Sequence, residues 1–334
     1  MLVASSISVV LLSQQQPDSV ILYLSKHGQH VDSIRLSGPD FPAQQVCLHQ
    51  LPQHLHRLKS LQASKLCLQL QPGHGYQGVL HAGMPLQQLH LGKCGLLDEE
   101  EGLAAALALL PALQHLGITG CSAINSPYLA VRSNALQGLQ HLTYLQVAGC
   151  GLQDSKGLSR LPGLQDLRLS DCNDLIIHSN ALSGLQRLTR LQVWGDRWCD
   201  NRGCLDPAVL IDKTRLQHLD LQECNIGSGS APVTELLSHL QQLQQLAQIT
   251  LKSSLLAAAS AAAYSALTAS SNLQYLNISN CRLSTGPWQH VFPTGRQLPD
   301  LCVLEIGHVC THSGMFLGSD WGHECNCLSP RACM

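Results

Sequence analysis

One spacing of apolar residues recurs along most of the chain and constrains its fold more than any other feature. In residues 142–152 (LTYLQVAGCGL), apolar side chains occupy positions 1, 4, 6 and 11, and a cysteine, Cys150, occupies position 9. This spacing indicates a short strand, Tyr144 to Ala148, followed by a turn that points Cys150 inward. The same pattern returns every 22 to 30 residues. We therefore predict a stack of one repeated unit.

The repeats align on their first apolar residue. Positions 1, 4 and 6 are Leu, Ile or Val throughout, except that Ala63 fills position 6 of the second repeat. Because side chains alternate along a strand, positions 2, 3, 5 and 7 leave the core, and neighbouring strands of the same direction pair as a parallel sheet. The first residues of the eleven predicted repeats are Val31, Leu58, Leu86, Leu113, Leu142, Leu164, Leu188, Leu216, Leu246, Leu273 and Leu301.

The segments that return from one strand to the next differ in length. Residues 102–110 follow four acidic residues and precede Pro111, which predicts a helix. Residues 234–246 and 256–269 predict helices in the same way. The repeats starting at Leu142 and Leu164 are shorter, so we expect an extended or single-turn return there. Residues 133–147 and 179–193 agree at twelve of fifteen positions, which indicates that a pair of repeats was duplicated.

The pattern divides the chain into three parts. Residues 1–30 are predicted to be a lead-in with a cap helix at Ser19 to His27, ended by Gly28. Residues 31–311 form the solenoid of about eleven repeats. Residues 312–334 lose the pattern, and we expect an irregular tail that is either disordered or part of a longer solenoid.

Composition and charge exclude several classes of protein. The net charge is −2 and there is no run of five basic residues, so nothing favours nucleic-acid binding. The uncharged stretch 253–280 is rich in Ala and Ser and keeps the repeat phase, so we predict no membrane span. The apolar residues 1–13 have no basic segment before them and no cleavage site after them, so we do not expect secretion.

The fifteen cysteines follow the repeat more than any bridging scheme. Six of them stand at position 9, where we expect small buried side chains. Their odd total and mostly reduced use predict a cytoplasmic protein, with a cytoskeletal or axonemal location as the alternative. The six are Cys94, Cys121, Cys150, Cys172, Cys224 and Cys281.

Several short motifs resemble catalytic or metal sites but lack the surroundings that such sites need. Residues 73–78 spell G-x-G-x-x-G, yet Pro72 precedes them and no helix is predicted to start there. The thiols and imidazoles of residues 310–327 have spacings that match no common closed zinc site. Cys199 and Cys204, in a Trp-containing loop, are interpreted as a reduced pair. We therefore predict no enzyme activity, no cofactor and no metal.

The unit L-x-x-L-x-L-x-x-C-x-L resembles the leucine-rich repeat family in its cysteine-containing, ribonuclease-inhibitor-like forms. This resemblance covers residues 31 to about 311 and implies an α/β horseshoe solenoid. Such a solenoid has a parallel sheet on its concave face, which binds the ligand, and helices and irregular returns on its convex face. Residues 24–36 also resemble the entry segment of F-box/leucine-rich-repeat-like proteins, although no F-box precedes them here.

The exposed strand positions supply the candidate binding residues. Most are small, amide or hydroxyl side chains, against which two aromatic residues and two arginines stand out. Trp, Tyr and Arg often carry interface energy, each frequently above about 2 kcal/mol when a partner buries it. The alternative is an ordinary solvated face whose aromatic residues are covered by nearby loops. The predicted partner-binding residues are Tyr144, Arg168, Arg190, Trp194, His218 and Asp220.

These expectations lead to one function and two alternatives. The chain is predicted to be a non-enzymatic module that binds a protein or peptide on its concave sheet, centred on Arg168, Arg190 and Trp194. A preformed rigid surface loses little entropy on binding, which favours this role. The alternatives are a substrate-recognition adaptor of a ubiquitin ligase and a cytoskeletal or axonemal scaffold, with the corresponding components as partners.

Overall fold

The computed structural model describes residues 5–11, 16–39, 46–71, 78–97, 102–123, 126, 128–172, 176–195, 205–224, 226, 230–252, 256, 259–284, 286–295, 298–307 and 310–311. The chain divides into two compact units, residues 1–174 and 175–334. In the described residues no helix is long and apolar enough to cross a membrane.

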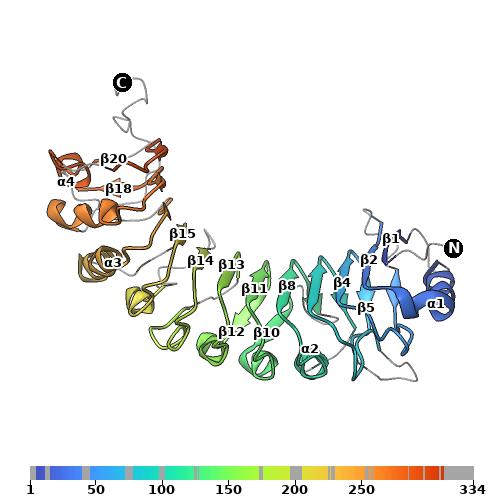
Figure 1. Ribbon diagram of the computed structural model, residues 1–334. Coiled ribbons are helices and arrows are strands. Elements are labelled where there is room, and N and C mark those ends of the chain that lie inside the picture. The colour runs from blue at the N-terminus through green and yellow to red at the C-terminus, as the bar shows by residue number, and fades with distance from the viewer. Residues whose placement is uncertain are drawn as a thin grey trace. The chain divides into compact units, whose positions relative to one another are not determined.

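The first unit is built on a parallel main sheet, with strand order β1-β2-β4-β6-β8-β11-β13 (Figure 1). Equivalent positions of successive repeats face each other: Leu145 pairs with Leu116 on one side and with Leu167 on the other. The predicted parallel sheet and its register are therefore confirmed here. The strands are β1 (Ser6–Val10), β2 (Ser33–Ser37), β4 (Ser60–Ser64), β6 (Gln88–Gly92), β8 (His115–Thr119), β11 (Tyr144–Ala148) and β13 (Asp166–Ser170).

Smaller elements form the returns of the first unit. A second parallel sheet, in the order β3-β5-β7-β9, follows the turns after the main strands, and β10 pairs with β12. The helix α2 lies on the opposite side of the unit from the main strands (Figure 1). These elements are β3 (Cys47–Leu48), β5 (Cys67–Leu68), β7 (Gly95–Leu96), β9 (Ser122–Ala123), β10 (Ala130–Arg132), β12 (Gly151–Gln153), α2 (Gly102–Ala108) and the 3₁₀ helices η2 (Ser133–Leu136) and η3 (Ser155–Arg160).

The strand β1 was not predicted from the sequence. It pairs in parallel with β2, and its Ile7 faces Ile34, a position-4 residue. The helix α1 (Gln16–His27), followed by the 3₁₀ turn η1 (Gly28–His30), connects these two strands. The predicted helix at 19–27 is therefore present, but it is the return of a repeat that precedes Val31.

The second unit repeats the same plan. Its main strands pair in parallel in the order β14-β15-β16-β17-β19, and Leu219 faces Leu191 and Ile249. Its elements are β14 (Arg190–Trp194), η4 (Pro207–Leu210), β15 (His218–Gln222), α3 (Ser230–Gln242), β16 (Gln248–Thr250), η5 (Ala261–Thr268), β17 (Tyr275–Asn277), β18 (Arg282–Leu283), α4 (Trp288–Val291), β19 (Val303–Glu305) and β20 (Cys310–Thr311).

The predicted returns are partly confirmed. Helices α2 and α3 are present, and α3 begins four residues earlier than predicted. The third predicted helix, 256–269, is a 3₁₀ helix over Ala261–Thr268 instead, which is the tighter form usual for short returns. The short repeat starting at Leu142 returns through the extended strand β12 and the six-residue 3₁₀ helix η3, which makes about two turns instead of the single turn expected.

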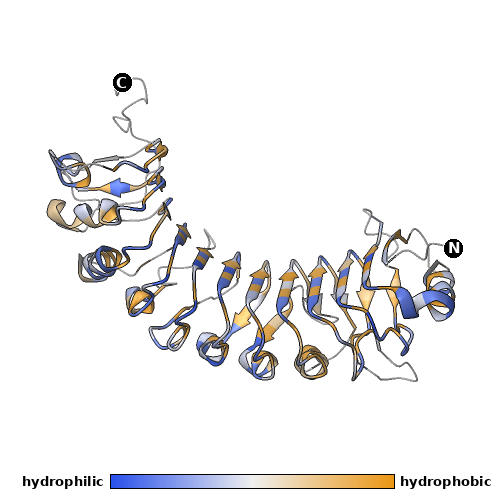
Figure 2. Cartoon of the chain, viewed as in Figure 1, coloured by the Kyte–Doolittle hydropathy of each residue, from blue (hydrophilic) through white to orange (hydrophobic). Residues whose placement is uncertain are grey.

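The core consists of the aliphatic residues that define the repeat. Positions 1, 4 and 6 are at most 2% exposed in the first ten predicted repeats, and hydrophobic and hydrophilic residues alternate along the strands in Figure 2. In the last repeat, Leu304 at position 4 is 42% exposed. The prediction that stacked leucines fill the core is thus confirmed up to the repeat of Leu273.

The six position-9 cysteines are buried free thiols, as predicted. Their sulfur atoms donate to backbone carbonyls of the preceding repeat: Cys94 Sγ lies 3.4 Å from Ala63 O, and Cys172 Sγ lies 3.4 Å from Val147 O. These two thiols therefore donate to carbonyls of the main strands β4 and β11, which an aliphatic side chain of similar size cannot do.

The duplicated segments 133–147 and 179–193 differ only at residues that the core does not bury. The three differing pairs are Gln137 and Ser183, His141 and Arg187, and Tyr144 and Arg190. The first two pairs are exposed and the third is half-buried on a main strand. Every buried residue of one copy is identical in the other.

Some expectations lie outside the described residues. These are the acidic start of the return at 98–101, the glycines of 73–77, the loop with Trp198, Cys199 and Cys204, and the tail 312–334 with the histidines and cysteines of residues 312–327. They stay predictions, as does the three-part division of the chain.

Candidate functional site

We call the side chains at positions 3, 5 and 7 of the main strands the exposed sheet face. All six predicted binding residues lie on it. Tyr144 and Arg168 belong to the first unit, on β11 and β13. The second unit holds Arg190 and Trp194 on β14, and His218 and Asp220 on β15.

Tyr144 and Arg168 are in direct contact. The guanidinium carbon of Arg168 lies 5.2 Å from the centre of the Tyr144 ring, which is a cation–π arrangement. Asp166, on the same strand, accepts two hydrogen bonds from Arg168, at 3.0 Å from Nε and 2.9 Å from the terminal nitrogen. This fork fixes the guanidinium plane, so the pair presents a preformed aromatic and cationic surface.

The other side of Tyr144 faces His115. The two ring centres are 5.9 Å apart with an interplanar angle of 31°. The Tyr144 hydroxyl donates to Gln146 Oε1 at 2.8 Å, which orients it along its own strand. Tyr144 is therefore held on three sides by Arg168, His115 and Gln146.

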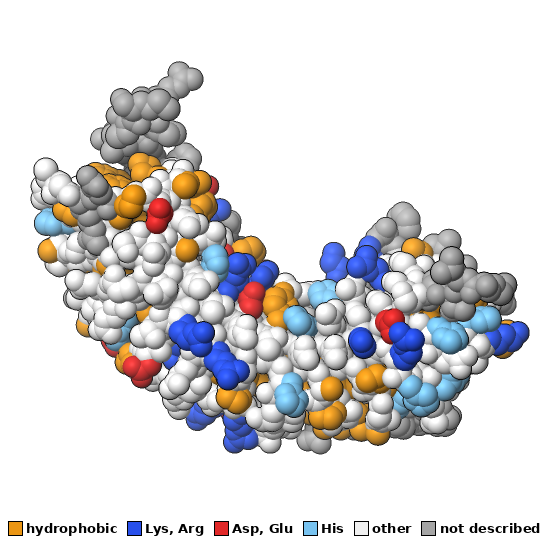
Figure 3. Space-filling model, viewed as in Figure 1, with side chains coloured by type: hydrophobic (Ala, Val, Ile, Leu, Met, Phe, Trp, Pro, Cys, Tyr) orange, Lys and Arg blue, Asp and Glu red, His pale blue; other side chains and the backbone are white. Residues whose placement is uncertain are grey.

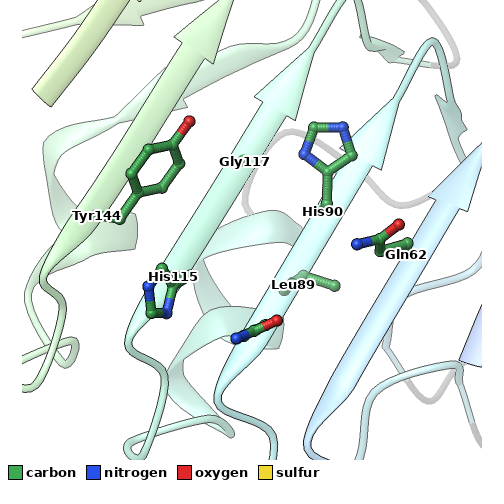
Figure 4. A pocket seen from close by; sticks show the side chains of 7 residues that line it. Gln62, Leu89, His90, His115, Gly117 and Tyr144 are labelled. Carbon is green, nitrogen blue, oxygen red and sulfur yellow. The ribbon is translucent and has the colours of Figure 1, made fainter. Parts of the chain in front are cut away.

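A shallow cavity of about 190 Å³ opens beside Tyr144 on this face. In Figure 4 the rings of Tyr144 and His90 stand on either side of the strand that carries Gly117, and Gln62 reaches in from the next strand. Arg35 donates to Gln62 Oε1 at 2.7 Å, which leaves the Gln62 amide N–H₂ group as a donor toward the cavity. The cavity is lined by Gln62, Gln88, Leu89, His90, His115, Gly117 and Tyr144.

His90 occupies the space that a side chain at position 117 would fill. A Cβ added to Gly117 would clash with His90 Nδ1. Burial lowers the pKa of His90 below its ordinary value, so the imidazole is neutral at pH 7. The His90 imidazole thus offers one neutral donor and one acceptor beside the aromatic ring of Tyr144.

In the second unit, Trp194 is anchored to Asp220. Its indole nitrogen donates to Asp220 Oδ2 at 3.1 Å, across the pair of strands β14 and β15. Gln222 donates to Asp220 Oδ1 at 3.0 Å and faces Trp194 in register. The Trp194 side chain remains 37% exposed. The hydrogen bond therefore fixes the indole while leaving part of its surface exposed, as is common for aromatic side chains that a partner buries.

Arg190 and His218 flank this pair. They are register partners on β14 and β15. Burial raises the pKa of the Asp220 carboxyl, while the hydrogen bonds from Trp194 and Gln222 and the charges of Arg190 and Lys252 oppose the rise. Asp220 therefore has hydrogen-bonding and charged neighbours that partly compensate its desolvation.

A further polar cluster lies on β17 and β19. Asn277 is only 7% exposed, and its amide nitrogen donates to the Tyr275 hydroxyl at 3.1 Å and to Glu305. Its side-chain oxygen accepts from the backbone of Ser279 at 2.9 Å. This asparagine is fully engaged inside the fold, so its role is structural.

The sequence analysis did not single out His90 or Gly117. The signal was present: position 5 carries a side chain in every other predicted repeat, and Gly117 leaves it empty. In a regular face, a missing side chain makes a hollow beside its neighbour, here His90. The prediction favoured prominent side chains and overlooked this gap.

In the part of the chain that the structure describes, there is no candidate metal centre, and the face seen in Figure 3 carries no continuous basic patch. Among the residues that the structure describes, no group of three or more His, Cys, Asp or Glu side chains could hold a metal ion. On the face seen in Figure 3, Lys and Arg form small separate groups. The arrangement is suited to hydrogen bonding and to contact with aromatic and charged groups.

Comparison with known proteins agrees with this architecture. The family model described as Leucine Rich Repeat matches residues 272–292, and a second, described as Leucine Rich repeat, matches residues 138–155 and 213–231. No curated protein matches the chain in sequence.

Solved structures with a similar fold include two internalins of Listeria monocytogenes. The structure of an internalin (inlF) is 16% identical, with a TM-score of 0.50, and the match covers 90% of this chain and 89% of that one. Internalin C2 (inlC2) is 18% identical, with a TM-score of 0.40, over 62% of this chain and 74% of that one. The in-register parallel strands, the buried leucine positions and the matched repeats establish that this chain is a leucine-rich repeat protein.

Proposed function

We propose that this chain is a non-enzymatic interaction module that binds a protein or peptide on its exposed sheet face. Leucine-rich repeats generally mediate protein–protein interaction, because stacked repeats present an extended surface of aligned side chains. The observation that carries the proposal is the Trp194 indole, which is partly exposed and held by Asp220. Because the hydrogen bond to Asp220 already restricts the Trp194 side chain, little further side-chain entropy is lost when a partner covers the ring.

The two units contribute separate sets of binding residues. In the second unit the set is Trp194 with Arg190, His218 and Asp220. In the first unit it is Tyr144 with Arg168, beside the cavity at His90. Aromatic and arginine side chains in a polar surround are typical of interface hot spots, and these side chains are already oriented by their neighbours.

We place this activity in the cytoplasm. The described cysteines are free thiols, including those at Cys94, Cys121, Cys150 and Cys172 that lie in successive repeats. A reducing compartment keeps such thiols free, which supports this location.

The proposal is tested in two steps with the full chain. Affinity purification coupled to mass spectrometry identifies the partner, and the purified partner is then titrated against the wild type and two variants. Arg190→Ala with Trp194→Ala tests the second unit, and Tyr144→Ala with Arg168→Ala tests the first. Tyr128→Ala is the matched control, because Tyr128 is 51% exposed and lies outside the main strands.

We expect each double variant to remain folded, with a small fall in its thermal unfolding midpoint because hydrogen bonds to Asp220 or Asp166 are lost, and to lose at least about tenfold in affinity, while Tyr128→Ala binds like the wild type. A set whose removal leaves the affinity unchanged does not take part in binding. Recovery of ubiquitin-ligase or cytoskeletal components as the direct partner would assign the ligand to one of the two alternative classes.

A further inference from the structure

Two cysteines that are not joined by a disulfide lie on neighbouring strands of the second sheet in the first unit. Cys47 on β3 and Cys67 on β5 are register partners in a parallel pair. Register partners in a sheet project to the same side, and adjacent strands lie about 4.8 Å apart. That separation falls within the Cα distances that disulfides span, about 4.4–6.8 Å.

The backbone holds these strands together around the two sulfur atoms. Cys67 N donates to Val46 O at 3.0 Å, and Gln69 N donates to Leu48 O at 3.0 Å. The strand β3 is the outer strand of its sheet, and it has only two residues. A short outer strand can make the small shift that closing a disulfide requires.

The strand on the other side of Cys67 carries no side chain at the facing position. Gly95 on β7 faces Cys67 in register, and a Cβ added to Gly95 would lie 3.3 Å from Cys67 Sγ. The row across the sheet therefore contains two thiols followed by an open position. Cys67 therefore has the Cys47 thiol on one neighbouring strand and no side chain at the facing position of the other.

Accessibility separates this pair from the buried cysteines of the repeat. Cys47 is half-buried and Cys67 is 6% exposed, whereas Cys94 and Cys121 are each 1% exposed. An oxidant in solution can reach Cys47 and has no route to Cys94 or Cys121.

We propose that Cys47 and Cys67 are a dithiol that exchanges with a low-molecular-weight disulfide, such as oxidised glutathione, to form an intramolecular disulfide. Burial, with a smaller contribution from Cys47, raises the pKa of Cys67 to about 11, so Cys67 is the later nucleophile. In a reducing compartment the dithiol form predominates, and the disulfide forms when the glutathione pool becomes oxidised.

The exchange takes two steps. The Cys47 thiolate attacks one sulfur of the small disulfide, which forms a mixed disulfide on Cys47 and releases one glutathione thiolate. Cys67 then loses its proton to solvent, and its sulfur attacks Cys47 Sγ and expels the second glutathione thiolate. The protein loses two protons and two electrons, and one oxidised glutathione becomes two reduced molecules. The product joins β3 to β5 and so links two consecutive repeats.

The test uses the full chain equilibrated in glutathione buffers from reducing to oxidising, quenched with acid, alkylated and digested with trypsin. Cleavage after Arg35, Arg57, Lys65 and Lys93 places Cys47 alone on peptide 36–57 and Cys67 alone on peptide 66–93. The exposed Cys302 is the internal control for the oxidant.

We expect the two peptides to appear linked, two hydrogens lighter than their sum, and to separate on reduction. Cys67→Ser, or Cys67→Ala if the first fails to fold, should instead keep glutathione on Cys47. The proposal is overturned if Cys302 carries glutathione while Cys47 and Cys67 are both alkylated. It is also overturned if Cys47 retains glutathione in the wild type, or if linkage requires prior denaturation in urea.

Discussion

The imidazole of His90 lies over Gly117, on the neighbouring strand, in the space that any larger residue there would need. Its burial, and hence its lowered pKa, depends partly on this position. The hollow next to Tyr144 depends on it as well, because His90 and Gly117 both line the cavity.

Gly117→Ala should displace the His90 ring and raise its pKa toward the ordinary value of about 6.5. The displaced ring becomes more exposed, and water favours its charged form. Only one side chain has to move, so we expect a loss of stability below about 1.5 kcal/mol. Titration of the His90 ring protons by NMR measures the pKa. Gly138→Ala is the control, since nothing lies within 4 Å of a Cβ at Gly138. An unchanged His90 pKa in the Gly117 variant contradicts the assignment.

Asp220 should make the stability of the chain depend on pH. Its folded-state pKa is raised, chiefly by burial, above the unfolded value of about 4. Between these two pKa values the folded state binds more protons than the unfolded state. The free energy of unfolding therefore decreases as the pH rises through this window, and the deficit is complete above the folded-state pKa.

Asp220→Asn should remove this dependence, because the amide does not ionise and its oxygen can still accept from Trp194 Nε1. Urea unfolding at a series of pH values, starting near pH 4, measures the difference between wild type and variant. We expect that difference to grow in favour of the variant as the pH rises, while the exposed Asp300→Asn control follows the wild type. Parallel curves for the wild type and Asp220→Asn would show that the carboxyl is not desolvated.

Asn277→Ala should lower the free energy of unfolding by about 1–3 kcal/mol. The change leaves the N–H of the half-buried Ser279 without its side-chain acceptor and removes the donor to Tyr275 and Glu305. Asn272→Ala, which removes an exposed 3.0 Å hydrogen bond to Gln244 O, is the matched control, with an expected loss below about 1 kcal/mol. Equal losses in the two variants by urea unfolding would argue against a special role for burial at Asn277.

The cysteines should react with an alkylating reagent at very different rates in the folded chain. Cys302 is exposed and should be modified first. Burial raises the pKa of Cys172 to about 12, which leaves about one thiolate in ten thousand at pH 8. Peptide mass spectrometry after timed quenching follows each site, and denaturant should bring the two rates together. Early modification of Cys172 in the folded state would contradict its inward position.

The repeat was predictable because an aliphatic residue occupies positions 1, 4 and 6 in nearly all of the eleven predicted copies. Strands such as β11 and β15 begin where the leucine spacing places them, at Tyr144 and His218. The strand β1 was missed because its repeat has Ser6-Ile7-Ser8-Val9 without the leucines and cysteine that mark the others. Its pairing with β2 was the missing information, and pairing is a long-range property.

The sequence predicted where the candidate binding residues lie on the sheet, but not which of them form hydrogen bonds with each other. Alternation along a strand places Trp194 and Asp220 on the same face. Their hydrogen bond depends on the rotamers of both side chains, which spacing alone does not determine. The cavity at His90 was missed for a related reason. Gly117 shapes this surface because it has no side chain, and a search for prominent side chains does not detect such a position.

The duplicated segments carry a lesson for engineering. Since Tyr144 and Arg190 occupy equivalent places above identical buried residues, what a strand displays outward can be rewritten without disturbing what it packs against. Exchanging such display residues between copies should retarget the protein while leaving its melting behaviour intact. In these two segments, the outward-facing residues of a strand can therefore vary independently of the buried residues beneath them.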